Sequence, residues 1–107
     1  MGGQPRYRST VAVAAQMNLK WTSKALSDLA RLHAFLAPVN RSAATRVVQS
    51  LTIVVERLLN HPRIGEKLDE FAPRQVHHIF VGDYEIRYEI NESTLYILRL
   101  WHTREDR

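Results

Sequence analysis

Hydrophobic positions change their spacing twice along the chain, from a strand-like period to a helical one and back. Asn18 to Trp21 alternates polar and apolar residues, which predicts a short strand. Helical spacing follows, with Ser23 expected to cap the helix and Pro38 to end it. The positions expected on the inner face of this helix are Leu26, Leu29, Ala30, His33 and Ala37.

A second helix is predicted from Asn40, its expected cap, to the segment Asn60-His61-Pro62. Proline has no N–H and disfavours helix in the residue before it, so the helix should stop there. Its apolar stripe comprises Ala44, Val47, Val48, Leu51, Val55, Leu58 and Leu59. The connection to the first helix is short, which favours an antiparallel helical hairpin.

The last third of the chain predicts three strands, over residues 76–81, 84–90 and 94–102. Gly82-Asp83 and the polar segment 91–93 are the expected turns, and residues 63–74 are expected to form a loop anchored by Leu68 and Phe71. This order predicts an α+β fold. An N-terminal strand and an antiparallel helical hairpin would pack on one face of a mainly antiparallel sheet, whose last three strands are connected as hairpins.

The strand patterns also assign side chains to faces. Tyr84, Ile86, Tyr88 and Ile90 should share one face, with Glu85, Arg87 and Glu89 on the other. In the last strand, alternation puts Arg99 on the face of Leu95, Ile97 and Trp101. Hairpin register is not fixed by these patterns, so whether Arg87 and Arg99 share a face stays open.

Composition narrows the class of protein. A chain of 107 residues that is 45% hydrophobic fits one domain, and no run approaches the ~20 apolar residues of a membrane span. Cysteine is absent, which excludes disulfides and cysteine-rich zinc sites and is compatible with a cytoplasmic location. The net charge is +4, and 12 of the 15 basic residues are arginine, which suits carboxylates and phosphates equally.

Residues 1–16 differ from the rest of the chain. They contain early glycine and proline and an apolar run of only five residues, shorter than the ~7–15 of a secretory signal. We expect a poorly ordered extension there, followed by one domain over residues 17–107.

Charged side chains inside an apolar strand are costly unless they face water or a partner. The sequence therefore predicts a surface for an anionic partner near the C-terminus, formed by Arg74, Arg87, Arg99, Trp101, His102 and Arg104. No metal site is expected, because His77 and His78 are adjacent and should point to opposite faces of a strand. No cofactor is expected either, since the chain has no glycine-rich phosphate loop and no nucleophile elbow.

Two C-terminal segments, GDYEIRYEI at 82–90 and ILRLWHTR at 97–104, together with the order of elements, resemble the RelE/ParE family of bacterial type II toxins. Trp21 before the first helix and the loop from Pro62 to Gly65 also look like family features. The resemblance covers roughly residues 17–107. It implies a cytoplasmic toxin that is neutralised by a cognate antitoxin protein and has no membrane partner.

The family contains two activities. RelE-like members cut messenger RNA on the ribosome with lysines and arginines of the sheet, and here His102, Arg87 and Arg99 would form a reduced catalytic set. ParE-like members inhibit DNA gyrase by binding. The chain has only three lysines, carries Glu85 where many RelE-like members are basic, and has no tyrosine after Tyr96. We therefore expect a ParE-like gyrase inhibitor that is not an enzyme. The alternatives are an mRNA endoribonuclease and an inactive member that binds only its antitoxin.

Overall fold

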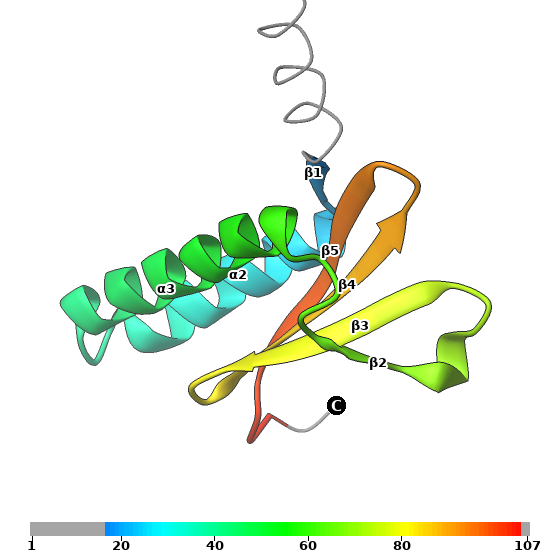
Figure 1. Cartoon of the computed structure of the whole chain (residues 1–107). Helices are drawn as coiled ribbons and strands as arrows, with labels where there is room; N and C mark the ends of the chain where they lie inside the picture. Colours follow the sequence, from blue (N-terminus) through cyan, green and yellow to red (C-terminus); the bar gives the residue numbers. More distant parts are fainter. Residues whose placement is uncertain (1–16, 106–107) are drawn as a thin grey trace, which may run out of the picture.

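The computed structural model describes residues 17–105, which form a five-stranded sheet with a helical hairpin on one face (Figure 1). The expected extension, residues 1–16, lies outside the described residues. In chain order the elements are β1 (Asn18–Trp21), α2 (Ser23–Leu36), α3 (Arg41–Asn60), β2 (Glu66–Lys67), the 3₁₀ turn η1 (Asp69–Phe71), β3 (Gln75–Val81), β4 (Tyr84–Asn91) and β5 (Thr94–His102).

The sheet has the strand order β1-β5-β4-β3-β2. β1 pairs with β5 in parallel and all other neighbours are antiparallel, so β5 is an interior strand. The predicted α+β fold is confirmed, including the three hairpin-connected strands. The helical hairpin covers one face of the sheet and its far end extends past the strands (Figure 1). We call the face turned away from the hairpin the open face.

The helix boundaries follow local chemistry. Asn40 caps α3 as predicted, by accepting the amide of Ala43 at 3.0 Å. The cap of α2 is Thr22 and not Ser23, because the Thr22 hydroxyl accepts the amide of Ala25 at 3.0 Å. The same hydroxyl donates to the carbonyl of Leu98 at 3.1 Å, so this cap also ties the start of α2 to β5.

The buried face of α2 differs from the predicted one. Ala25, Asp28 and Leu32 are buried, whereas Leu26 is 52% exposed. The predicted face was shifted by one position because an aspartate occupies the centre of the true one. The stripe of α3 is confirmed, with Leu51 among its fully buried members.

A β-bulge in β5 corrects the predicted faces of the last strand. Arg87 pairs with Arg99 but the next residue of β4, Tyr88, pairs with Ile97, so Leu98 is the extra residue. The bulge reverses the alternation of faces, so two residues that are two positions apart across it, such as Ile97 and Arg99, point to opposite faces of the sheet. Leu95 and Ile97 lie in the core, and Arg99 lies with Arg87 on the open face.

The segment predicted to be a loop, 63–74, contains β2 and η1. β2 extends the sheet by pairing with His77 and His78 of β3. Gly65, at the start of this segment, donates its amide to the Tyr88 hydroxyl at 2.9 Å. A Cβ at this position would lie 2.6 Å from the His78 carbonyl oxygen, so only glycine fits.

Candidate functional site

Arginine and aromatic side chains alternate across the open face. Arg87 of β4 lies between two rings, with its guanidinium carbon 5.3 Å from the Phe71 centroid and 4.7 Å from the Trp101 ring. Arg74 lies 6.0 Å from Phe71 and Arg99 lies 4.9 Å from Trp101. We call these five residues the arginine–aromatic row. They come from η1, from the segment that follows η1, from β4 and from β5. Cation–π contacts of this geometry contribute about 0.5–1 kcal/mol each at exposed sites.

The two outer arginines of the row are each bound to a carboxylate. Arg74 donates twice to Glu89, at 3.1 and 2.7 Å, and Arg99 donates twice to Asp28, at 2.7 and 3.1 Å. In such a bidentate pair the carboxylate neutralises the guanidinium charge through two charge-assisted hydrogen bonds, which are stronger than neutral ones. The hydrogen bonds that the two arginines donate to Glu89 and to Asp28 raise the pKa of Arg74 and of Arg99 respectively.

The central arginine is bound less completely. The nearest carboxylate oxygen to Arg87 is that of Glu85, 3.9 Å from a guanidinium nitrogen, which is too long for a hydrogen bond. The Arg87 Nε is buried and has no hydrogen-bond partner among residues 17–105. About a quarter of the side chain, 25%, remains exposed. The row thus holds one guanidinium with unused hydrogen-bond donors, at its centre.

Asp28, which supports the row from α2, was missed by the sequence analysis. It is 2% exposed and accepts hydrogen bonds from Arg99, from Arg31 and from the backbone amide of Leu100. Burial acts to raise its pKa, but the hydrogen bonds from Arg99, Leu100 and Arg31 outweigh it, and the pKa lies below its ordinary value. The available signal was its spacing, since Ala25, Asp28 and Leu32 recur at i, i+3 and i+7.

A histidine bridges two carboxylates beside Arg87. His78 places Nδ1 2.9 Å from Glu85 and Nε2 3.0 Å from Glu66, linking β2, β3 and β4. Burial opposes the imidazolium charge, but the hydrogen bonds to Glu66 and Glu85 raise the pKa of His78 above its ordinary value. Glu85 is 4% exposed, so its carboxylate contacts other side chains of the sheet and is not accessible to solvent. As predicted, His77 points to the other face, where it stacks on Tyr88.

The predicted site residues fall into two groups on opposite faces. Arg74, Arg87, Arg99 and Trp101 come together in the row, whereas His102 pairs with Tyr84 and packs edge-on against its ring at 5.1 Å, on the hairpin side. The structure therefore does not bring His102 together with Arg87 and Arg99, the other members of the alternative catalytic set. Register is the physical reason, since His102 pairs with Tyr84, a residue of the core face.

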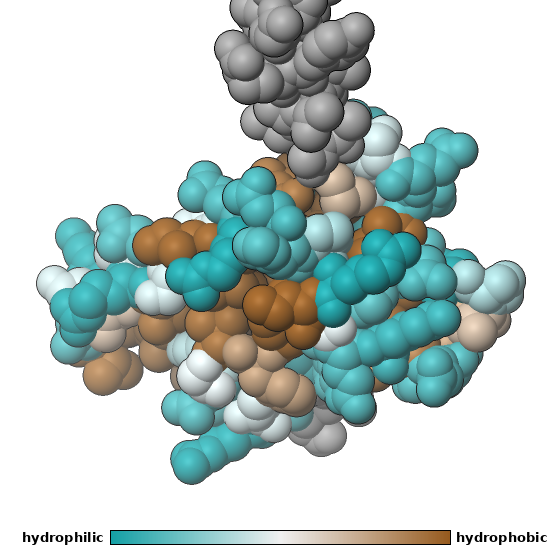
Figure 2. Space-filling view, in the orientation of Figure 1, coloured by the Kyte–Doolittle hydropathy of each residue, from teal (hydrophilic) through white to brown (hydrophobic). Residues whose placement is uncertain are grey.

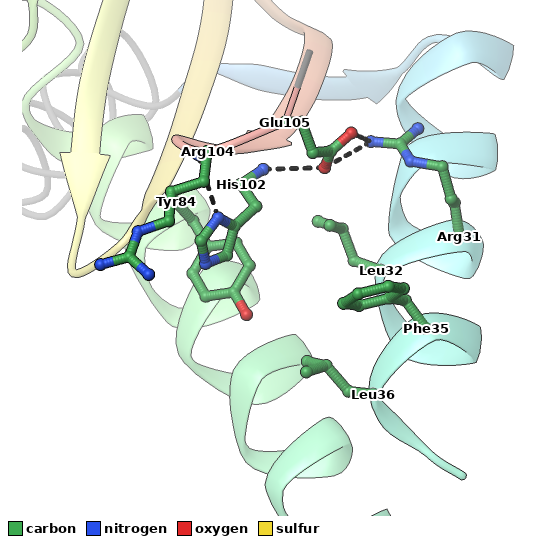
Figure 3. Close-up of a pocket in the computed structure, with 8 residues that line it drawn as sticks. All are labelled: Arg31, Leu32, Phe35, Leu36, Tyr84, His102, Arg104 and Glu105. Carbon is green, nitrogen blue, oxygen red and sulfur yellow. Dashed lines mark hydrogen bonds and ion pairs between the residues drawn. The ribbon is translucent and has the colours of Figure 1, made fainter. Parts of the chain in front are cut away.

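His102 and Arg104 instead line a groove of about 550 Å³ between α2 and the ends of β4 and β5 (Figure 3). Leu32, Phe35 and Leu36 supply its apolar wall, and Phe35 is 77% exposed. Glu105 accepts the His102 amide at 2.9 Å and pairs with Arg31 at 3.0 Å, which fixes the rim (Figure 3).

A second hollow of about 510 Å³ lies on the other side of Tyr84, against α3. Val47 and Leu51 line it from α3 and Val81 from β3. Hydrophobic residues gather below the hairpin on this side of the molecule, surrounded by hydrophilic ones (Figure 2). The two hollows share Tyr84 as a lining residue and lie beneath the overhanging end of the hairpin, and we refer to both together as the channel.

Within 17–105, no group of three or more His, Asp or Glu side chains is arranged to hold a metal ion. No helix in the same part of the chain is both long and apolar enough to cross a membrane.

Comparison with known proteins gives a family match and several solved structures with a similar fold, two of which are described below. The model of the family described as the ParE toxin of the type II toxin–antitoxin system parDE matches residues 19–107. A chain of the chromosomal ParDE system from P. aeruginosa superposes with a TM-score of 0.69 at 22% identity, covering 82% of this chain and 97% of that one.

The second structure is from the toxin–antitoxin complex RelBE2 of Mycobacterium tuberculosis. It superposes with a TM-score of 0.61 at 22% identity, covering 81% of this chain and 98% of that one. At this identity the two structures support the fold alone. No significant match was found among curated protein sequences.

Proposed function

Since this chain belongs to the ParE family of toxins from type II toxin–antitoxin systems, we propose that it arrests growth by binding and inhibiting DNA gyrase in the cytoplasm. On this proposal it acts as a binding inhibitor and not as an enzyme. A cognate antitoxin neutralises it, as the complexes formed by its structural neighbours suggest.

The observation that carries the proposal is the state of the cations on the open face. Cleavage of RNA by its 2′-hydroxyl needs an acid, a base and cations free to stabilise a phosphorane. Arg74 and Arg99 are each held by a carboxylate in two hydrogen bonds, and His102 lies on the opposite face. The residues brought together here suit recognition of a protein surface better than cleavage of a phosphodiester.

The second candidate, an mRNA endoribonuclease, is favoured by one observation. His78 is hydrogen-bonded to Glu85, and Glu85 lies 3.9 Å from Arg87. A histidine oriented by a carboxylate next to a guanidinium is a chemically sufficient acid–base group once its Nε2 is released by Glu66, whose side chain is 79% exposed. If this activity exists, it would depend on His78 and not on the predicted His102.

We assign the antitoxin to the channel beneath the hairpin. Its walls are apolar, Phe35 is left largely exposed beside it, and Arg46 and Arg104 line it without an ion pair among residues 17–105. An amphipathic antitoxin segment with apolar anchors and acidic flanks matches these features in polarity and charge. Burial of exposed aromatic surface would supply the affinity.

The test is a pair of assays with purified protein. We expect inhibition of gyrase supercoiling at stoichiometric protein, relief by the antitoxin, and intact messenger RNA with or without ribosomes. Specific cleavage of messenger RNA that disappears in His78→Ala, together with unimpaired gyrase, would overturn the gyrase proposal in favour of the second candidate. His102→Ala is the matched control, because it removes a histidine from the other face.

A further inference from the structure

We propose that Arg87 is the anchor of the target-binding surface, and that it binds a single carboxylate side chain of the toxin's protein target. This inference rests on the proposed function for the identity of the partner. The site itself, a guanidinium between Phe71 and Trp101 on the open face, is argued from geometry.

The two rings position Arg87 as a recognition group. Phe71 comes from η1 and Trp101 from β5, so two separate elements hold one guanidinium in place. A guanidinium carries its N–H bonds in its own plane, so they point outward from its edge. That edge matches the two oxygens of a carboxylate, and little side-chain entropy remains to be lost on binding.

Arg87 differs from its neighbours Arg74 and Arg99 in the hydrogen bonds that its guanidinium makes within the chain. Arg74 and Arg99 each make two charge-assisted bonds to an acid within the chain. Arg87 has one carboxylate at 3.9 Å and a buried Nε with no partner among residues 17–105. The buried Nε is shielded from solvent, so a ligand would bind through the exposed part of the guanidinium, whose N–H groups make no hydrogen bond among residues 17–105.

The surrounding charges favour a carboxylate of a protein over a nucleic-acid backbone. A phosphate backbone is bound by several uncompensated cations that release counterions. Here the basic groups Arg74, Arg99 and His78 are already paired with Glu89, Asp28, Glu66 and Glu85. One incompletely paired arginine therefore fits one carboxylate.

The neighbouring surface is also suited to a protein. Phe80, 56% exposed, packs edge-on to His78 on the same face, at 5.1 Å between ring centroids. Arginine and aromatic residues are the types that dominate binding energy at protein interfaces. The channel assigned to the antitoxin lies on the opposite face, so the open face is the surface left for the target.

The site can be tested without knowing the target. The probe is a blocked pentapeptide with one central glutamate, titrated into ¹⁵N-labelled protein while the Arg87 Nε–H and Trp101 indole N–H signals are followed. We expect saturable shifts of both signals, absent with the glutamine version of the peptide and absent in Arg87→Gln. Arg57→Gln, an exposed arginine on α3, is the matched control and should behave as wild type.

Three results in this titration would overturn the site. They are no shift with the glutamate peptide, equal shifts with both peptides, or larger shifts of the same signals with a hexauridylate RNA. Thermal unfolding of each variant shows whether it is folded. Arg87→Lys keeps the positive charge but lacks the planar guanidinium, so it provides a second variant, which should also bind the glutamate peptide more weakly.

Induction in cells tests the assignment to the target. We expect Arg87→Gln to weaken growth inhibition roughly 30-fold in inducer response, the size typical of an interface hot spot, with unchanged antitoxin affinity. Undiminished toxicity of the folded variant would overturn the assignment. A wild-type protein without toxicity would instead contradict the proposed function, and the peptide titration would still decide the site.

Discussion

The Asp28 carboxylate accepts the backbone N–H of Leu100 at 2.9 Å, joining the middle of α2 to the outer edge of β5. β1 pairs with β5 only as far as Ile97, so within residues 17–105 the edge beyond it has no neighbouring strand. Arg31 donates to the Leu100 carbonyl at 3.2 Å, and thus α2 satisfies both backbone groups of this residue. Unpaired strand edges invite association with other chains, and here side chains of a helix close one.

Asp28→Ala should therefore be one of the more destabilising single changes. It removes the partner of the Leu100 amide and of Arg99, and we expect a loss of about 2–4 kcal/mol in the free energy of unfolding. Asp28→Asn keeps an acceptor for the amide and should cost about half as much. Urea denaturation measures both, and an unchanged midpoint for Asp28→Ala would contradict this account.

The boundaries of α3 and of β4 were predictable because the apolar spacing of α3 and the alternation of β4 are regular. Three features were not. Leu98 lies in a strand that is apolar on both sides, so no pattern marks a bulge there. Asp28 has the spacing of a buried position, but its charge favours solvent, so it was not assigned to the buried face. The third is the separation of His102 from Arg87, which depends on the register that the bulge sets.

The arginine–aromatic row could also be predicted only in part. Arg87, Arg99 and Trp101 were predicted as binding residues from their types and strand positions. Phe71 was expected only to anchor a loop, because nothing in sequence indicates that η1 folds back over β4. Contacts between distant segments are decided by packing, which periodicity does not encode.

The imidazole of His78 should make stability depend on pH. Its pKa is raised in the folded state by Glu66 and Glu85, so the stabilisation is fully present below the unfolded pKa of about 6.5 and is lost as pH rises through the higher folded value. We expect the free energy of unfolding to fall above about pH 6.5 in wild type, and this dependence to disappear in His78→Gln. Identical pH profiles of the two proteins would contradict the bridge.

The pKa of Asp28 has the opposite effect. Because it is lowered in the folded state, its contribution is present above the unfolded value of about 3.9 and is lost as pH falls through the lower folded value. Asp28→Asn should thus remain closer to its neutral-pH stability under acid than wild type does. Acid titration followed by circular dichroism gives the comparison, and parallel curves would show that Asp28 does not contribute.

Leu51 tests the interface between the hairpin and the sheet. It is fully buried in the core cluster, so Leu51→Ala should destabilise the protein by about 2–5 kcal/mol. Ile53→Ala, on the exposed side of the same helix, is the matched control and should change stability by less than about 1 kcal/mol. Similar losses for the two variants would mean that α3 packs through another face.

Phe35 allows the antitoxin channel to be tested without disturbing the fold. It is 77% exposed beside the channel, so Phe35→Ser should leave the unfolding midpoint nearly unchanged while removing an aromatic anchor. We expect the affinity for the antitoxin to fall by at least about tenfold, since aromatic anchors at interfaces contribute about 2 kcal/mol or more. Isothermal titration with purified antitoxin measures the change, with Ile53→Ala as the exposed apolar control on α3. In cells, the Phe35→Ser toxin should remain toxic but need more antitoxin for rescue. Loss of toxicity with antitoxin affinity unchanged would reverse the assignment and make this channel the target surface.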